Sequence, residues 1–230
     1  MILLFLIFLL TMALSLWATA KVKSTYHRYS RYTVRSGMTG AEAAAAILER
    51  AGIHNVEIVA HDGFLGDHYD PIHRRLVLCH ENFFGRSPAA LGVAAHEAGH
   101  ALQHAQAYRP LQWRMAAVGA ATFANQIVTF MPLLFMGTHL MEPMLGFTLM
   151  AVGWGIIMAF NLITLPVEFD ASRRAHALLT RMGMVTDQEA EAVQKVLRAA
   201  AWTYVAAFIS SLLYFLFFLL PLLTGGRSRN

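Results

Sequence analysis

The chain of 230 residues is poor in charge and almost free of cysteine. Asp, Glu, Lys and Arg make up only 14% of the residues, whereas a soluble domain has about 25%. The hydrophobic fraction of 57% excludes a disordered chain, and the two fractions together argue against an ordinary cytosolic domain. The single cysteine, Cys79, excludes an intramolecular disulfide framework and a cysteine-ligated zinc ribbon. The net charge of +4 comes with no basic block over an RNA- or DNA-binding motif, so we expect no nucleic-acid partner.

Four long segments contain no charged residue at all. Crossing about 30 Å of hydrocarbon takes about 20 residues of α-helix, and each segment reaches that length. We therefore predict transmembrane helices near residues 2–19, 115–136, 145–165 and 201–223. The fold class that follows is a mainly α multi-pass membrane protein, with the lipid bilayer as a partner.

The first apolar run also ends in Ala18-Thr19-Ala20, a pattern that a signal peptidase can cleave. No positive charge precedes this run, and Lys21 follows it directly, so we expect a retained anchor with an external N-terminus. Residues 21–114 and 166–200 are then cytoplasmic, and they hold every Lys and Arg except the two arginines at the C-terminus. This bias obeys the positive-inside rule and predicts a multi-pass protein of the plasma membrane.

These spans divide the sequence into five parts. They are an N-terminal anchor (1–20), a cytosolic region (21–114), a two-span hairpin (115–165), a second cytosolic segment (166–200) and a C-terminal helix with a short tail (201–230).

Short-range signals predict a small α+β arrangement between the first two spans. Thr39 and Thr186 each open a capping box, and Ser87-Pro88 gives an N-cap followed by a proline at the first helical position. The expected elements are a helix over 39–52, strands at 56–60 and 76–79 separated by a turn-rich stretch at 61–73, a helix over 88–108 and a helix over 186–198.

The motif that carries chemistry is His96-Glu97-Ala98-Gly99-His100, which matches HExxH. Two histidines four residues apart lie on one helical face, so both imidazoles can reach one ion, and imidazole is a good zinc ligand. Glu97 lies about 100° round the helix from His96, where it can move a proton from a water molecule to the leaving amine without binding the metal. We predict one Zn2+ ion with His96 and His100 as ligands and Glu97 as the catalytic residue.

A catalytic zinc usually has three protein ligands. Gln103 and Gln106 stand where the extended motif HExxHxxGxxH requires Gly and His, so the third ligand must come from elsewhere. Glu168 is the best candidate, because two spans separate it from the motif and both therefore return to the same membrane face. Asp170 is the main alternative ligand.

Five segments together resemble a known family. They are Asp67–Pro71 (DHYDP), Leu76–Leu78 (LVL), Gly85–Ser87 (GRS), Val93–Leu102 (VAAHEAGHAL) and Pro166–Ala175 (PVEFDASRRA). In this order they resemble the YugP-type neutral zinc metallopeptidases of bacterial membranes, over about residues 25–220. The resemblance implies a membrane-embedded zinc protease of the glutamate-zincin kind that acts on a peptide or membrane-protein substrate. It also implies the same ligands, His96, His100 and Glu168, with Glu97 as the base.

A looser similarity is to membrane zinc proteases whose second motif reads E-x-x-x-D. In those proteases the aspartate accepts the second ring N–H of a ligand histidine and so orients the ring. Here the position is Ser172, one helical turn after Glu168, which we expect to act more weakly. Asp170 could take this role only with different local geometry. We expect His104 to be a solvated polar residue.

Three functions fit these observations. The leading one is a zinc-dependent endopeptidase at the cytoplasmic membrane face, and the alternatives are an intramembrane-cleaving zinc protease and a non-catalytic zinc-binding membrane scaffold. The motif helix is flanked by Arg86 and Arg109, which suits an interfacial position, and a purely structural site has no need of Glu97. The strand at 76–79 is either an edge strand that pairs with an extended peptide or an internal strand.

Overall fold

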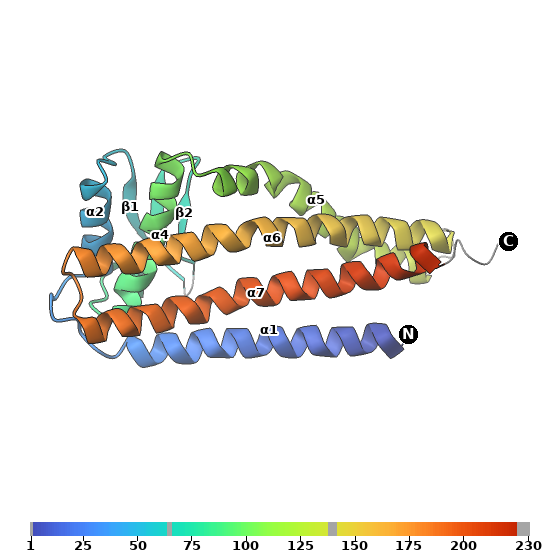
Figure 1. The fold of residues 1–230 in the computed structure, drawn as a ribbon, viewed down its shortest axis with the longest axis horizontal. Helices are drawn as coiled ribbons and strands as arrows, with labels where there is room; N and C mark the ends of the chain where they lie inside the picture. Colours follow the sequence, from blue (N-terminus) through green and yellow to red (C-terminus); the bar gives the residue numbers. More distant parts are fainter. Residues whose placement is uncertain (1, 64–65, 138–141, 225–230) are drawn as a thin grey trace. The chain divides into compact units, whose positions relative to one another are not determined.

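The computed structural model describes residues 2–63, 66–137 and 142–224. In chain order the elements are α1 (Ile2–Tyr29), α2 (Gly40–Arg50), β1 (Glu57–His61), β2 (His68–Asp70), β3 (Arg75–Cys79), α3 (His80–Phe83), α4 (Pro88–Ala105), α5 (Arg109–Gly137), α6 (Pro143–Arg181) and α7 (Asp187–Thr224) (Figure 1). The turn of the expected hairpin at 138–141 and the C-terminal tail at 225–230 lie outside the described residues.

The chain divides into two compact units. The first comprises Met1–Trp17, Trp113–Leu165 and Thr203–Asn230, and the second comprises Ala18–Gln112 and Pro166–Trp202. The first unit coincides closely with the expected spans, and the second contains the HExxH motif and Glu168. The assignment of these parts to the membrane and to the cytosol stays a prediction.

Three of the described helices, α1, α6 and α7, are long and apolar enough to cross a membrane. In the first unit, Trp154 of α6 stacks on Tyr214 of α7 with ring centroids 4.4 Å apart. The Tyr214 hydroxyl lies 3.3 Å from Oγ1 of Thr11 in α1, so one polar contact links α1 to α7. The fourth expected span, 115–136, lies within α5, which does not meet the same criterion over its described residues. Four spans therefore stay a prediction.

Two predicted boundaries between a span and a cytosolic helix are absent. The span at 145–165 and the segment that follows it form one helix, α6, which continues through Pro166. The helix at 186–198 and the span at 201–223 likewise form α7. Three alanines, at 199–201, join the two parts of α7, and alanine is the residue that extends a helix most readily.

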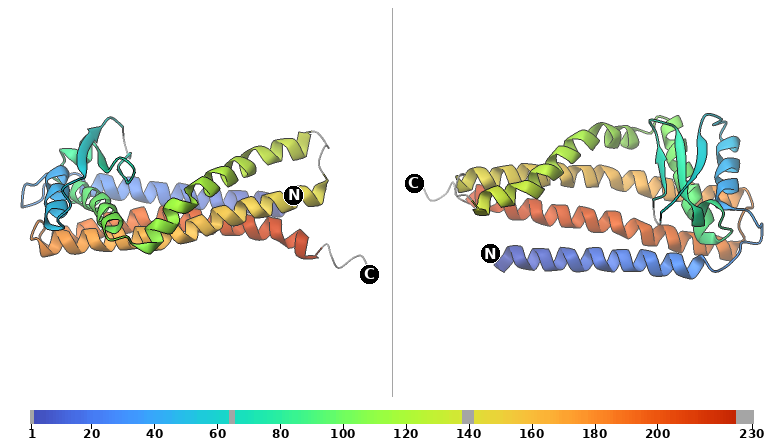
Figure 2. Two further views of the ribbon diagram at one scale, coloured as in Figure 1. Left: turned by 90° about the horizontal axis from the view of Figure 1, so that it is seen from above. Right: turned by 180° about the vertical axis from the view of Figure 1, so that it is seen from behind.

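The sheet of the second unit has the order β1-β3-β2, with β1 parallel and β2 antiparallel to β3 (Figure 2). The expected strands at 56–60 and 76–79 correspond to β1 and β3 within one residue at each end. Because β3 has a partner on both sides, the interpretation of 76–79 as an edge strand for a peptide is wrong. The free edges belong to β1 and β2. β2 lies inside the stretch predicted as turn-rich, because three residues are too few to show an alternating pattern.

Helix capping in the second unit follows the sequence closely. Thr39 and Glu42 form the predicted capping box at the start of α2, and Oγ of Ser87 accepts a hydrogen bond from the Ala90 N–H at the start of α4. The core joins α2, β3, α4, α6 and α7, and its fully buried side chains include Ile47, Leu76 and Leu179. α4 is therefore fixed by its cap and by its buried face.

Candidate metal centre

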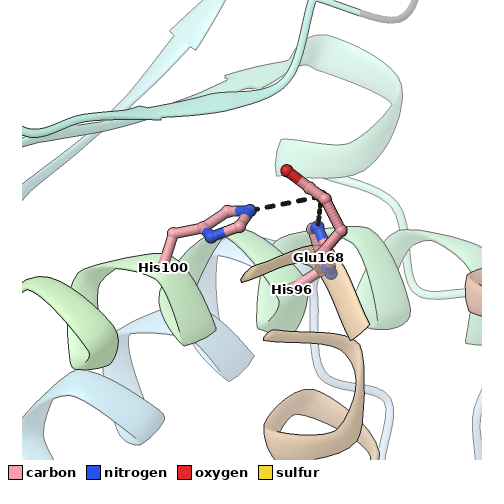
Figure 3. A group of neighbouring side chains, drawn as sticks. All are labelled: His96, His100 and Glu168. Atoms are coloured by element: carbon pink, nitrogen blue, oxygen red, sulfur yellow. Dashed lines mark hydrogen bonds and ion pairs between the residues drawn. The ribbon is translucent and has the colours of Figure 1, made fainter. Parts of the chain in front are cut away.

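α4 carries His96 and His100 on one face, with their ring centroids 4.7 Å apart. α6 brings Glu168 to the same point (Figure 3). Oε2 of Glu168 lies 3.1 Å from Nε2 of His96 and 3.6 Å from Nε2 of His100. The three side chains predicted as metal ligands therefore converge, although 67 residues or more separate Glu168 from the histidines in the sequence.

This convergence depends on a close approach of the two helices. Gly99 lies between the two histidines on α4, and a Cβ atom added to it would lie 2.9 Å from the backbone oxygen of Ala171 in α6. Real Cβ atoms essentially never approach an oxygen so closely, so a larger residue would push the helices apart. The glycine inside the HExxH motif thus has a packing role that lets Glu168 reach the histidines.

The three donor atoms have the spacing that zinc requires. Donors about 2.1 Å from a tetrahedral ion lie about 3.4 Å from one another, and the two nitrogen–oxygen distances of 3.1 and 3.6 Å lie on either side of this value. All three donor atoms lie within 4.8 Å of one another. Two imidazoles and one carboxylate are also a donor set that zinc accepts, so these residues fit the ion.

Burial makes the electrostatics of the cluster strong. Glu168 is 2% exposed and His100 is 8% exposed. Burial alone would raise the pKa of Glu168, but hydrogen bonds from His100 and His96, together with their charge, hold it far below its usual range. Burial alone would lower the pKa of His100, but the hydrogen bond and charge of Glu168 and the charge of Glu97 raise it. The cluster is thus a buried anionic carboxylate between two bases, which suits a cation.

A second layer of side chains orients both rings. Oγ of Ser172 lies 3.1 Å from Nδ1 of His96, which confirms the contact predicted for Ser172. Oε1 of Gln103 lies 3.0 Å from Nδ1 of His100. The amide nitrogen of Gln103 donates hydrogen bonds to the Val167 carbonyl and to Asp170. Its oxygen therefore faces His100 and accepts a hydrogen bond from the Nδ1–H group. In the neutral imidazole, this leaves the Nε2 lone pair of His100 directed towards the cluster.

Asp170, the alternative third ligand, has another role. Its carboxylate accepts hydrogen bonds from Gln103, Arg173 and Arg174, and it is not part of the cluster of possible ligands among the described residues. Burial would raise the pKa of Asp170, but these three donors lower it. Asp170 therefore acts on the site through Gln103 rather than by joining the cluster. In the sequence, Gln103 stands out only as a departure from the extended motif.

Glu97 is buried and reaches the sheet. Its Oε2 accepts a hydrogen bond of 2.9 Å from the backbone N–H of Tyr69 in β2. The Tyr69 hydroxyl lies 2.9 Å from Nδ1 of His104, so the expectation that His104 is merely solvated is wrong. Tyr69 links β2 to α4 at two points, and no local pattern in the sequence indicated this role.

Comparisons with known proteins identify a family of zinc metallopeptidases. Residues 4–222 match a family model described as "Putative neutral zinc metallopeptidase". A relative from Bacillus subtilis (strain 168), named "Putative membrane protease YugP", is 42% identical over 224 residues, which cover 95% of this chain and 96% of the relative. No solved structure matches the chain.

Proposed function

Because the chain belongs to this metallopeptidase family, we propose that it is a zinc-dependent endopeptidase anchored in the membrane. His96, His100 and Glu168 hold one zinc ion, and Glu97 is the catalytic base. The observation that carries the proposal is the approach of Glu168 to both histidines of the HExxH motif, at a spacing that suits zinc. The name of the bacterial relative, a membrane protease, supports the same activity.

The three proposed ligands contribute to ion binding in different ways. Glu168 contributes the negative charge, and the two imidazoles are held in place by Ser172 and Gln103. Zinc held in this way supplies a Lewis acid that polarises the peptide carbonyl and makes a water molecule acidic near neutral pH. Three protein ligands are also the usual number for a catalytic zinc, since the fourth position then remains open.

Glu97 moves the proton of the reaction. The Tyr69 N–H fixes its Oε2, so its other oxygen is the one that accepts a proton from the attacking water. The same carboxyl group then gives this proton to the nitrogen of the leaving amine, which becomes a neutral leaving group. The backbone hydrogen bond to Tyr69 limits how far the carboxylate can swing between these two positions.

The proposed place of action is the cytoplasmic membrane face, on peptides or on membrane-protein substrates. The distribution of Lys and Arg supports this side. Glu168 follows the expected span at 145–165 by three residues on the same helix, or by about 4.5 Å of helical rise. This position favours cleavage at the interface over cleavage in the interior of the bilayer.

Replacing Glu97 tests the proposal. Glu97→Gln keeps the size of the side chain but cannot accept the proton, so hydrolysis of a peptide library should fall to about 1% or less, with zinc content unchanged. Zinc and turnover are measured on the same purified full-length protein, with and without a chelator. A zinc-loaded Glu97→Gln protein with normal turnover would refute the base, and zinc-loaded unmodified protein without any hydrolysis would favour the scaffold.

A further inference from the structure

A cleft of about 410 Å3 lies in the second unit, and none of the proposed metal ligands lines it. One wall is the C-terminal part of α1, and the other is the segment that leads from α3 into α4. The lining side chains with polar groups include Lys23, His27 and Ser30 on the first wall and Glu81, Arg86 and Ser87 on the second. The proposed protease activity does not use this cleft.

The α1 wall presents one face of a helix. Lys23, His27 and Ser30 are spaced by four and three residues, so their side chains lie in one row. Tyr26 also lines the cleft, is only 5% exposed, and donates a hydrogen bond of 2.7 Å to Oδ1 of buried Asn82. This bond ties α1 to α3 beside the cleft.

The second wall adds positive charge. Arg86 lines the cleft and donates a hydrogen bond to the Gly37 carbonyl, which holds its guanidinium group in place. Ser87 is the N-cap of α4, a helix of 18 residues, so the positive end of that helix dipole lies at the cleft. Glu81 is the one carboxylate among the lining residues. The two positive charges of Lys23 and Arg86 exceed its single negative charge, so the cleft favours an anion.

The position along α1 indicates where the anion comes from. The uncharged run of α1 ends at Ala20, and Lys23 follows three residues later, or about 4.5 Å along the helix axis. The headgroup layer on each side of the hydrocarbon is about 5–8 Å thick, so Lys23 reaches the depth of lipid phosphates. Basic pockets beside membrane helices are a known type of site for anionic headgroups.

We infer that this cleft binds the phosphate group of an anionic phospholipid headgroup, with Lys23 and Arg86 as its two cationic contacts. Soluble phosphate shares this chemistry, but it lacks the acyl chains that a membrane helix would hold beside the cleft. A bound lipid would connect the membrane anchor α1 to the first turn of α4, the helix that carries the HExxH motif.

The test measures lipid binding to delipidated full-length protein in a neutral detergent, by native mass spectrometry with phosphatidylglycerol as the probe. Lys23→Gln/Arg86→Gln should lower the affinity about 25-fold, since each basic side chain at a membrane surface contributes about five-fold. The matched control is Lys21→Gln/Arg28→Gln, which removes two charges from exposed positions of α1 that do not line the cleft. Its affinity should change much less, because neither side chain lines the cleft. Glu81→Gln removes the opposing carboxylate and should raise the affinity.

Two further measurements distinguish specific binding of an anionic lipid from nonspecific binding of any lipid or anion. Phosphatidylcholine should bind more weakly than phosphatidylglycerol, and inorganic phosphate at about 10 mM should displace little of the lipid. Equal losses in the two double variants, or no gain in Glu81→Gln, would overturn the inference. Inorganic phosphate that displaces the lipid completely would show a site for a soluble anion instead. Thermal unfolding of each variant distinguishes lost binding from lost folding.

Discussion

Gln103 controls the direction of a proposed zinc ligand from the buried side of α4. It is fully buried and makes three hydrogen bonds, one to Nδ1 of His100 and two to oxygens of α6. Since an imidazole ring can rotate about its bond to Cβ, the ring needs such a partner to keep Nε2 aimed at the ion. Gln103 thus takes the role that a carboxylate often has beside a zinc-bound histidine.

We predict that Gln103→Leu lowers zinc affinity about 10- to 100-fold, which is the usual cost of losing a hydrogen bond to a metal-bound histidine. The matched control is Gln106→Leu, which changes an exposed glutamine three residues further along the chain. Titration with a competing zinc chelator compares the two variants with the unmodified protein. Equal affinities for Gln103→Leu and Gln106→Leu would show that Gln103 has only a packing role.

At the residue scale, the sequence predicted the side chains that come together, and of the residues that orient them it predicted only Ser172. His96 and His100 follow from the motif, and Glu168 follows from the topology of the spans. Gln103 and Tyr69 could not be predicted, because their roles depend on partners in other elements. A hydrogen bond from a backbone N–H of a short strand leaves no pattern in the amino-acid sequence.

At the scale of elements, the close packing of α4 against α6 lets Glu168 reach the two histidines. Gly99→Ala places a Cβ atom 2.9 Å from the Ala171 oxygen, and overpacking of this kind costs about 1–3 kcal/mol of stability. We expect lower thermal stability and weaker zinc binding in this variant. Gly119→Ala is the control, since a Cβ atom there has no neighbour within 4 Å. Gly99→Ala with unchanged stability and zinc affinity would contradict the close approach.

Local signals predicted the elements well where a cap or a strong pattern marked them. The starts of α2 and α4 follow from Thr39 and Ser87, whose side chains make the expected cap bonds. The continuity of α6 through Pro166 did not follow, because proline usually ends or kinks a helix. Strand order likewise depends on long-range pairing, which placed β3 in the centre.

For the whole molecule, the predicted orientation places both cytosolic segments on one side. Cys79 is only 2% exposed and would react poorly, so reporters are better placed at Ile72 and Asp187, which are exposed. We predict that Ile72→Cys and Asp187→Cys, each in a Cys79→Ala background, resist a membrane-impermeant maleimide in intact cells. Arg227→Cys should be labelled, because the C-terminal tail is expected outside. Labelling of Asp187→Cys from outside would reverse the orientation.

The zinc content of Glu168→Ala is the most direct test of the metal centre, because this carboxylate joins α6 to the two histidines of α4. Purified full-length protein should hold one zinc per chain. Glu168→Ala should lose it together with activity, since two imidazoles alone hold zinc weakly. Asp170→Ala should keep the ion when zinc is saturating, because Asp170 contacts Gln103 rather than the cluster. Full zinc in Glu168→Ala, with zinc lost from Asp170→Ala, would contradict the proposed ligand set.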